Sequence, residues 1–447
     1  MNFIEEYKKK LVSAEEAVKI VKDGDWVDYS QACAFPEALD AALAARRDEL
    51  HDVKIRGAIG MKPVQVVEQD PEHKAFTYNV WHCAASDRRY VDQGLAYYIP
   101  MLFRNNGAYY TRGFAPVNVA MISVAPMDFN GNFSYGLVNC CTQELLDAAD
   151  HIILEVNEQM PVIYGLANDH INIADVDYVV EGHKDICTTP LPGAPSEVDR
   201  KIAANIFPYL YDGINLQIGI GNMPNVLGSM IAESDLKDLG VHTELFTDAY
   251  LRLYEAGKIT NRKKNIHRGK SVFSVSNGTL ELYRFMDHNI DILSAPMAYV
   301  NNPETIRQLD HFVSINGCIA ADLYGQVCSE TAGTRHISGT GGQLDFVTGA
   351  FTAEHGYAFL AMPSTITDKK TGKVSSRILP KFTGGDVITT PRTQAPYIVT
   401  EYGVACLPGK TTWERAEMLV NIAHPDFREE LIAAAEEQKI WRRSNKR

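Results

Sequence analysis

The feature that most constrains the fold of this chain is an internal repeat. The segment IVKDGDWVDYS around Asp23 matches YLYDGINLQIG around Asp212, with an offset of 189 residues. HDVKIRG matches KDLGVHT at an offset of 186, and MDFNGNF matches ADLYGQV at an offset of 194. A fourth pair, ADHIILEV and APYIVTEY, has an offset of 246. Because the four pairs keep one order along the chain, they predict a tandem duplication of one structural unit.

Each copy alternates short apolar strands with capped helices. Ser13-Ala-Glu-Glu is a capping box that begins a helix, strands are predicted at 26–29 and 53–59, and a helix is predicted at 36–50. This alternation favours open α/β sheets. The 447 residues also exceed the usual size of one hydrophobic core, so at least two domains are expected.

We predict an N-terminal α/β domain at 1–195 and a C-terminal α/β domain at 196–447, joined by the turn-rich link 192–196. The fourth offset exceeds the third by 52 residues, which predicts an insertion at about 326–400 in the second copy. Insertions in one copy of a duplicated scaffold are natural places for substrate-specific loops.

The charge balance excludes some classes of function. A formal net charge of −13 argues against a nucleic-acid or anionic-membrane surface, which needs clustered positive charge. The N-terminal segment is too charged for a signal peptide, and no apolar run approaches the length of a membrane span. The eight cysteines show no metal-ligand spacing, so we expect reduced thiols in a cytoplasmic protein without a metal site.

The stretch 214–248 carries the first candidate site. INLQIGIGNMP predicts a strand that enters a glycine-bracketed turn, with Pro224 in the first turn of the following helix. A dinucleotide site is disfavoured, because Pro224 replaces the third glycine of G-x-G-x-x-G. The turn could present N–H groups to a ligand. A plain strand-to-helix turn explains the motif equally well.

The same stretch ends in GVHTELF, which contains Glu244. The offset of 186 places Ala58 at the matching position of the first copy. A carboxylate present in one copy only suggests a nucleophilic role. The alternative is a salt-bridged or solvated glutamate at the end of a strand, which is the more common case.

Two further segments leave alternatives open. SGTGGQLDFVTGA at 338–350 is rich in glycine and could approach a ligand closely, or be a flexible surface turn. The basic cluster between Lys258 and Lys270 could meet phosphates, but a solvated turn is the commoner reading. The chain has no G-x-S-x-G and no HExxH, so serine-hydrolase and zinc-peptidase functions lack support.

Taken together, GIGNMP, GVHTELF, ADLYGQV, GTGGQLDF and INIAHPDF resemble the acetyl-CoA hydrolase/transferase family over essentially the whole chain. The resemblance implies two similar open α/β domains with the active site between them. It implies a glutamyl-CoA thioester on Glu244. It also implies contacts of coenzyme A (CoA) with Gly219, Ile220, Gly221, Asn222, Met223, Ile319, Gly342 and Lys369. Lys370 is the alternative to Lys369, because the alignment of this loop can slip by one residue.

The resemblance further implies a ping-pong CoA-transferase that moves CoA from a short-chain acyl-CoA, with butyryl-CoA favoured, to acetate in short-chain fatty acid fermentation. No cofactor is expected to be bound permanently, and CoA is both substrate and covalent intermediate. A homo-oligomer is a family-level expectation. The alternatives are a 4-hydroxybutyrate or propionate CoA-transferase, an acyl-CoA hydrolase, or a non-catalytic CoA- or nucleotide-binding protein. Candidates for the acyl pocket are 30–35, 81–83 and 130–136.

Overall fold

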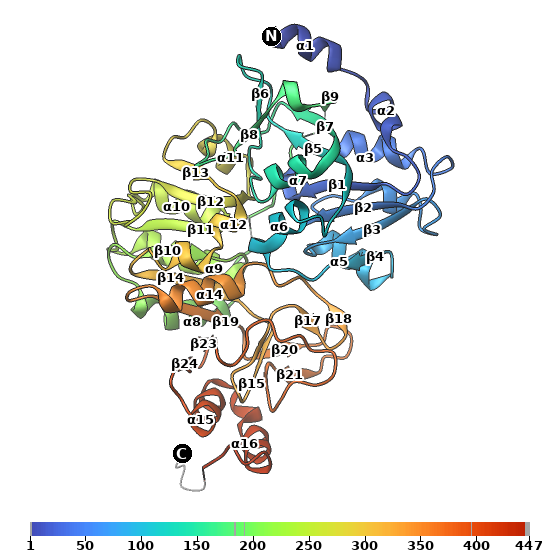
Figure 1. Ribbon diagram of the computed structural model, residues 1–447. Coiled ribbons are helices and arrows are strands. Elements are labelled where there is room, and N and C mark those ends of the chain that lie inside the picture. The colour runs from blue at the N-terminus through green and yellow to red at the C-terminus, as the bar shows by residue number, and fades with distance from the viewer. Residues whose placement is uncertain (1, 183–184, 192, 395, 443–447) are drawn as a thin grey trace. The chain divides into compact units, whose positions relative to one another are not determined.

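The computed structural model describes residues 2–182, 185–191, 193–394 and 396–442 (Figure 1). Pro192, the first residue of the predicted link, lies outside these ranges. The chain forms two large, mainly parallel β-sheets with helices packed on their strands. This is the α/β architecture that the alternation of strands and helices predicted.

The first sheet has the strand order β4-β3-β2-β1-β5-β7-β9, and all its neighbours are parallel. Its strands are β1 (Trp26–Gln31), β2 (Val53–Ala58), β3 (Phe76–Val80), β4 (Ala96–Tyr98), β5 (Val117–Val124), β7 (Ala149–Asn157) and β9 (Tyr178–Gly182). The α-helices of this half are α1 (Phe3–Lys10), α2 (Ala14–Ala17), α3 (Glu37–Ala44), α4 (Gln65–Glu68), α5 (Ala85–Asp92), α6 (Asn106–Thr111) and α7 (Thr142–Ala148).

The second sheet has the order β13-β12-β11-β10-β14-β19-β23-β24, with β24 antiparallel to β23. Its strands are β10 (Asn215–Ile218), β11 (Gly240–Phe246), β12 (Ser271–Ser276), β13 (Ile292–Ser294), β14 (Phe312–Gly317), β19 (Tyr357–Ala361), β23 (Tyr397–Thr400) and β24 (Gly403–Cys406). The remaining α-helices are α8 (Glu197–Ile206), α9 (Asn222–Glu233), α10 (Asp248–Glu255), α11 (Leu280–Met286), α12 (Met297–Val300), α13 (Pro303–Ile306), α14 (Gln343–Thr352), α15 (Thr412–Ile422) and α16 (Arg428–Glu437).

Smaller strands and 3-10 helices complete the described fold. One small sheet joins β15 (Ala320–Asp322), β16 (Val327–Cys328) and β22 (Ile378–Leu379). Two-stranded pairs are β6 (Asn132–Ser134) with β8 (His170–Asn172), β17 (Thr331–Ala332) with β18 (Arg335–His336), and β20 (Thr365–Thr367) with β21 (Val374–Ser376). The 3-10 helices are η1 (Val18–Ile20), η2 (Ala32–Ala34), η3 (Phe103–Asn105), η4 (Ile173–Asp175), η5 (Phe207–Tyr209) and η6 (Pro425–Phe427).

Local sequence signals explain many of these element boundaries. The Ser13 hydroxyl accepts the Glu16 N–H at 3.2 Å and caps α2, which is one of the two bonds of the predicted capping box. The predicted strand 53–59 ends one residue early, because Ile59 has φ 53° and leaves the extended conformation. The predicted helix 36–50 is shorter than expected and ends at Ala44.

The strand order confirms the predicted duplication. β10-β11-β12-β13 repeat β1-β2-β3-β4, while β14, β19 and β23 repeat β5, β7 and β9. In both halves the first strand therefore lies between the second strand and the fifth, and the chain changes direction at that point. The turns repeat as well, because Gly24 and Gly213 have φ values of 82° and 81°, and Asp52 and Asp238 have φ values of 57° and 59°.

A third pair of turns is matched down to its hydrogen bonds. The Asp128 carboxylate accepts the N–H groups of residues 130 and 132, both at 2.8 Å. The Asp322 carboxylate accepts those of residues 324 and 326 at 3.1 and 2.9 Å. Gly131 and Gly325 follow with φ values of 81° and 83°. A left-handed glycine closes each turn, so the aspartate and the glycine recur together.

The fourth predicted pair, Glu155 with Glu401, is wrong. Glu155 lies in β7, whereas Glu401 follows β23, and β7 corresponds to β19 in the strand order. The pairing of β5 with β7 matches that of β14 with β19 when β7 and β19 are offset by 206 residues, so Ala361 corresponds to Glu155. The pairing of the last strands, β9 and β23, gives an offset of 219 residues between them. The extra residues of the second half are therefore divided between two connections.

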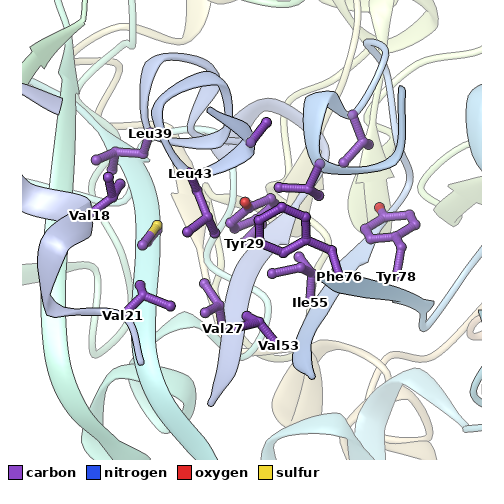
Figure 2. Packing of buried hydrophobic residues seen from close by; sticks show 14 of the residues in the cluster. Val18, Val21, Val27, Tyr29, Leu39, Leu43, Val53, Ile55, Phe76 and Tyr78 are labelled. Atoms are coloured by element: carbon purple, nitrogen blue, oxygen red, sulfur yellow. The ribbon is translucent and has the colours of Figure 1, made fainter. Parts of the chain in front are cut away.

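A buried cluster packs along the first sheet (Figure 2). Its labelled members lie on β1, β2 and β3, on α3, and in and after η1; they are Val18, Val21, Val27, Tyr29, Leu39, Leu43, Val53, Ile55, Phe76 and Tyr78. Each large apolar side chain buried in this way contributes roughly 1.5–3 kcal/mol. Such packing holds β1, β2 and β3 together with α3 in the first half.

By its internal contacts the chain divides into two compact units. The first contains 1–190, 244–247 and 272–300, and the second contains 191–243, 248–271 and 301–447. In the first unit, Val138 forms an isolated β-bridge with Val275 of β12, and Gly165 forms one with Ser294 of β13. Two loops of the N-terminal half therefore pair with these strands. Among the described residues, no helix has the length and apolar character needed to cross a membrane.

Candidate active site

The turn after β10 depends on two glycines. The Gly219 N–H donates to the Ile315 carbonyl of β14 at 2.8 Å, and a Cβ on Gly219 would lie 3.2 Å from the Asn316 side-chain oxygen. Gly221 has φ 121° and ψ −178°, a conformation that is essentially restricted to glycine. The glycine bracket noticed in the sequence is therefore required by the backbone path from β10 into α9.

The first turn of α9 is left open toward solvent. Gly221 is the N-cap and has no side chain to cap the helix, and Pro224 has no N–H to donate. The Asn225 N–H returns to the Gly221 carbonyl at 3.3 Å. Within the described chain, the N–H groups of Asn222 and Met223 therefore have no acceptor. Such N–H groups at a helix N-terminus favour an anion or a polarised carbonyl oxygen.

This turn lies at the switch point of the second sheet. The chain proceeds from β10 through β11 and β12 to β13 on one side, and from β14 to β19 on the other. Ligands of open α/β sheets bind outside the carboxyl ends of the strands at such a point. The turn at 219–221 follows β10 there, and Ile319 follows the end of β14 by two residues.

Gly342 lies at the same edge of the sheet. It is the N-cap of α14, a helix that connects β14 with β19 and packs on both strands, and it has no side-chain cap. The next residue, Gln343, is buried and accepts from the Ser329 hydroxyl at 2.8 Å, while its amide donates to Thr390 at 3.0 Å. These bonds hold the glycine-rich segment 338–342 against the small strands.

Lys369 lies apart from these residues. It is an exposed residue of the turn between β20 and β21, eight residues beyond the end of β19. The Asp368 carboxylate shapes this turn by accepting the N–H groups of Lys370 and Thr371, both at 2.8 Å. Lys369 and Lys370 are both exposed there.

Glu244 is half-buried near the end of β11 and belongs to the first compact unit. The strand registers support its pairing with Ala58, because Trp26 faces Lys54 in the first sheet and Asn215 faces Gly240 in the second. Glu244 therefore occupies the position that an apolar residue takes in the first half. The sequence repeat had predicted this equivalence.

Cys140 lies close enough to Glu244 to sense its charge. Burial raises the pKa of the Cys140 thiol, the neighbouring Ser274 lowers it, and the carboxylates of Glu244 and Glu144 raise it further. Cys140 also has φ 42°, a left-handed conformation that is uncommon for a side chain of this kind. Local backbone strain of this type often occurs at functional sites.

The basic cluster at 258–270 has a largely structural use. Lys264 is buried, and its ammonium group donates to the carbonyls of Val241 and Lys270 at 2.7 and 2.6 Å. Burial lowers the pKa of Lys264 to about 7. Lys258 donates to the Ser234 carbonyl. Lys264 thus ties its loop to β11, and Lys258 ties its loop to the C-terminal end of α9. Among the described residues, no group of three or more His, Cys, Asp or Glu side chains is arranged to hold a metal ion.

The candidates for the acyl pocket have clear structural contacts. In the loop 30–35, the Cys33 thiol approaches the Cys187 carbonyl and the Tyr283 hydroxyl, each at 3.4 Å. Trp81 donates to the hydroxyl of Tyr110 at 3.1 Å and packs within the core. The segment 130–136 includes β6, which pairs with β8. Each segment therefore has a structural explanation, and none is assigned to a substrate.

Two family models match the chain. The N-terminal domain of acetyl-CoA hydrolase/transferase matches residues 1–189, and the C-terminal domain of acetyl-CoA hydrolase/transferase matches residues 278–435. Together they cover well over half of the sequence. The chain belongs to the acetyl-CoA hydrolase/transferase family. The resemblance seen in the sequence motifs is thereby confirmed.

Relatives within the family are similar over their whole length. The chain is 49% identical over 445 residues to the probable butyrate:acetyl-CoA coenzyme A-transferase of Syntrophomonas wolfei, covering 99% of this chain and 98% of the relative. It is 46% identical over 447 residues to the butyryl-CoA:acetate CoA-transferase of Anaerostipes caccae, covering 100% of both.

Solved structures of the same architecture include RipA from Yersinia pestis. It has a TM-score of 0.90 and 32% sequence identity, covering 98% of this chain and 100% of that one. The 4-hydroxybutyrate CoA-transferase of Porphyromonas gingivalis has a TM-score of 0.78 and 32% identity, with the same coverage. The fold of two parallel α/β sheets is thus shared with CoA-transferases.

Within this family member, the residues predicted to bind CoA fall into two groups. Gly219, Ile220, Gly221, Asn222, Met223, Ile319 and Gly342 gather at the carboxyl edge of β10, β14 and β19. Lys369 lies in the separate hairpin. Sequence reasoning missed Cys140 and Ser274 near Glu244. The left-handed backbone of Cys140 has no clear signal in its sequence, and a serine inside an apolar strand has none.

Proposed function

We propose that this chain is a CoA-transferase that moves CoA from butyryl-CoA to acetate through a thioester on Glu244. The relatives named above support the reaction, because two of them are named for butyrate or butyryl-CoA and acetate. The observation that carries the role of Glu244 is its place in the repeat. The duplicated strand puts a carboxylate in the second half where the first half has Ala58.

The first half-reaction needs two nucleophilic steps. A Glu244 carboxylate oxygen attacks the acyl-CoA carbonyl, the C–S bond breaks, and an acyl-glutamyl anhydride and CoA thiolate result. The thiolate then attacks the glutamyl carbonyl, the bond to the acyl oxygen breaks, and butyrate leaves. Glu244 is now a thioester of CoA. Both attacking groups are anions, so no general base is required.

The second half-reaction reverses these steps with acetate. Acetate attacks the glutamyl thioester and releases CoA thiolate, which attacks the acetyl carbonyl of the new anhydride. Acetyl-CoA leaves, and the Glu244 carboxylate is regenerated. Each tetrahedral intermediate needs hydrogen-bond donors for its oxyanion. We assign the role of oxyanion donors to the N–H groups of Asn222 and Met223, which begin α9. Two facts support this: these N–H groups have no side-chain cap, and they follow β10, which is the neighbour of β11 in the sheet.

We assign CoA binding to the turn 219–223, to Ile319 and Gly342, and to Lys369 in its hairpin. The open N-termini of α9 and α14 at a switch point support the first three assignments. An exposed lysine supports the last, because it can meet a phosphate of CoA. The domain division at 195/196 is proposed on the same grounds as the repeat, and the region 326–400 contributes the loops that carry Gly342 and Lys369.

Trapping the covalent intermediate tests this proposal. The enzyme is incubated with butyryl-CoA and no acceptor, and intact mass spectrometry should show one added CoA per chain. Borohydride reduction and peptide mapping should then locate the modification at Glu244. A matched Glu233→Gln variant, altered at an exposed residue of α9, should form the adduct normally. Turnover without an adduct, or an adduct on another residue, contradicts the mechanism.

A panel of acceptors distinguishes the related activities. Acetate, propionate, butyrate, 4-hydroxybutyrate and water are compared by kcat/KM with one labelled acyl-CoA donor. We expect acetate to be preferred over 4-hydroxybutyrate and hydrolysis to be slow. One methylene in an apolar pocket changes discrimination by roughly 1–3 kcal/mol, so propionate is the closest competitor. Rapid release of free CoA without any acceptor would instead identify a hydrolase.

A further inference from the structure

Ser274 is a buried hydroxyl that the fold itself does not use. It lies in β12 and is fully buried, and its Oγ makes no hydrogen bond of good geometry among the described residues, the Cys140 thiol being its polar neighbour. Burying a hydroxyl without a partner is unfavourable, and buried polar atoms in proteins are rarely left unpaired. An alanine or valine would fill an apolar strand without this cost. The stability of the fold therefore does not explain why a hydroxyl stands at this position, and a role toward a substrate would.

The strand register places this hydroxyl beside Glu244. The Ser276 hydroxyl and the Asn277 N–H both donate to the Phe246 carbonyl, at 3.0 and 3.2 Å, so the end of β12 lies beside the end of β11. Two residues back along both strands, Ser274 therefore lies at the level of Glu244. Paired residues of neighbouring parallel strands project from the same face, and the strands are about 4.8 Å apart.

A neighbouring serine on the same strand behaves differently. The Ser276 hydroxyl donates to the Phe246 carbonyl at 3.0 Å, so its polar group is satisfied within the fold. The two serines lie two residues apart on one strand, and of the two only the one at the level of Glu244 makes no hydrogen bond of good geometry among the described residues. This contrast makes Ser276 a matched control for Ser274.

The surrounding loop holds Ser274 and Cys140 in one cluster with Glu244. The N–H groups of Asn139 and Cys140 both donate to the Ser274 carbonyl, at 3.1 and 3.2 Å, and the Cys140 carbonyl accepts the Met297 N–H at 2.6 Å. These bonds fix the left-handed backbone of Cys140. Burial keeps the Cys140 thiol protonated by raising its pKa. Cys140 is therefore a poor competing nucleophile.

We propose that the Ser274 hydroxyl is a catalytic hydrogen-bond donor to the Glu244 oxygen that becomes the glutamyl carbonyl. When the CoA thiolate attacks the glutamyl carbon of the anhydride, the C=O electron pair moves onto this oxygen. Ser274 stabilises that oxyanion and keeps its own proton. The intermediate then collapses by breaking the bond to the acyl oxygen, and the carboxylate leaves. This role rests on the proposed glutamyl-CoA function.

Ser274→Ala tests the donor. Removing one preorganised oxyanion donor lowers kcat by about 10²-fold to 10³-fold in other enzymes, and we expect a loss in that range. KM for butyryl-CoA should stay within a factor of two or so, because the bond forms only with the developing charge. The melting temperature should be unchanged or higher, because the variant removes an unpaired buried hydroxyl.

Ser276→Ala should show the opposite pattern. It breaks a hydrogen bond that the fold uses, so the melting temperature should fall while kcat per folded enzyme is kept. Ser274→Thr retains a hydroxyl and should recover part of the lost kcat. A merely structural role for Ser274 predicts instead that Ser274→Ala loses melting temperature and keeps kcat, and that result overturns the proposal.

The rate of adduct formation separates this inference from the proposed function. Rapid quenching and mass spectrometry should show glutamyl-CoA forming more slowly in Ser274→Ala than in the wild type, on the same residue. If the adduct forms on Glu244 at the wild-type rate in this variant, Ser274 is not a donor and the glutamyl-CoA mechanism still stands. If the wild-type enzyme forms no adduct on Glu244, the proposed function itself fails.

Discussion

The two halves of the molecule share a scaffold but treat the carboxyl edge of their sheets differently. In the first half, the Glu155 carboxylate accepts the N–H groups of Ala38 and Leu39, at 2.9 and 3.1 Å, and so caps α3 from the end of β7. In the second half, Ala361 corresponds to Glu155, and the N-terminus of α9 is open. The first half supplies its own anion, whereas the second leaves room for one from a substrate.

Other carboxylates close the first half in the same way. The buried Asp40 accepts the N–H groups of Gln65 and Val66 at the start of α4, and the buried Asp87 accepts those of Gly60 and Ala84. Internal carboxylates thus occupy N–H groups at the starts of α3, α4 and α5 in the first half. A duplicated scaffold can keep one copy for stability while the other acquires chemistry, and Glu244 in place of Ala58 fits that division.

The largest loss of activity should come from replacing Glu244, the carboxylate that the second half has and the first half lacks. Glu244→Gln should lower kcat by roughly 10³-fold or more, because an amide oxygen is a poor nucleophile for acyl transfer. Adding Ala58→Glu to this variant should not restore activity, because the first edge is closed. Steady-state kinetics with butyryl-CoA and acetate measures both. Recovery in the double variant would show that the halves are chemically interchangeable.

The closing carboxylate of the first half should give the protein a pH-dependent stability. Burial raises the pKa of Glu155 to about 7, against the backbone hydrogen bonds that lower it. The native state then holds this proton more tightly than the unfolded chain between pH 4.5 and 7. Stability therefore falls as pH rises through that window, by up to about 3 kcal/mol.

Glu155→Gln should remove this contribution. Denaturant unfolding at a series of pH values should show a flatter dependence for Glu155→Gln than for the wild type. Glu158→Gln, at an exposed position nearby in the chain, serves as the control and should keep the wild-type slope. Identical slopes for Glu155→Gln and the wild type would mean that the carboxylate does not titrate in this range.

The turn after β10 should tolerate no side chain at Gly221. Gly221→Ala meets its nearest atom outside the adjoining residues, Pro224 Cδ, only at 3.9 Å, so the cost is backbone strain of about 1–3 kcal/mol. We expect a higher KM for butyryl-CoA and a lower melting temperature. The equivalent Ala32 already has φ 48°, so Ala32→Gly should be well tolerated. A normal KM in Gly221→Ala would show that the turn does not shape the CoA site.

The smallest expected change in kinetics comes from giving the second half a carboxylate at the position that corresponds to Glu155. Ala361→Glu places a carboxylate where Glu155 stands, and it should compete with CoA for the N-terminus of α9. We expect KM for butyryl-CoA to rise about tenfold, which corresponds to about 1.4 kcal/mol, with kcat largely kept. Ala361→Gln, of the same size but uncharged, should raise KM less. Equal effects of both variants would indicate crowding and not anion competition.

Three of the four repeat pairs were readable from the sequence for a physical reason. Turns with left-handed backbone restrict the residue types that can occupy them, so Asp and Gly recur at the same places in both copies. The glycine bracket at 219–221 is visible for the same reason. The pair of Glu155 with Glu401 failed, because an acid after an apolar strand carries no information about which strand lies beside it.

The sequence by itself determined the α/β class, the duplication, the equivalence of Glu244 with Ala58, and the glycine-bracketed turn after the strand at 214–218. These follow from local rules of turn geometry and apolar periodicity, which act within a few residues. The tertiary structure decided that β7 corresponds to β19, that Glu155 caps α3, and that Ser274 lies opposite Glu244. Those relations join residues 30 or more positions apart through strand register, and register is fixed by the packing of the whole sheet.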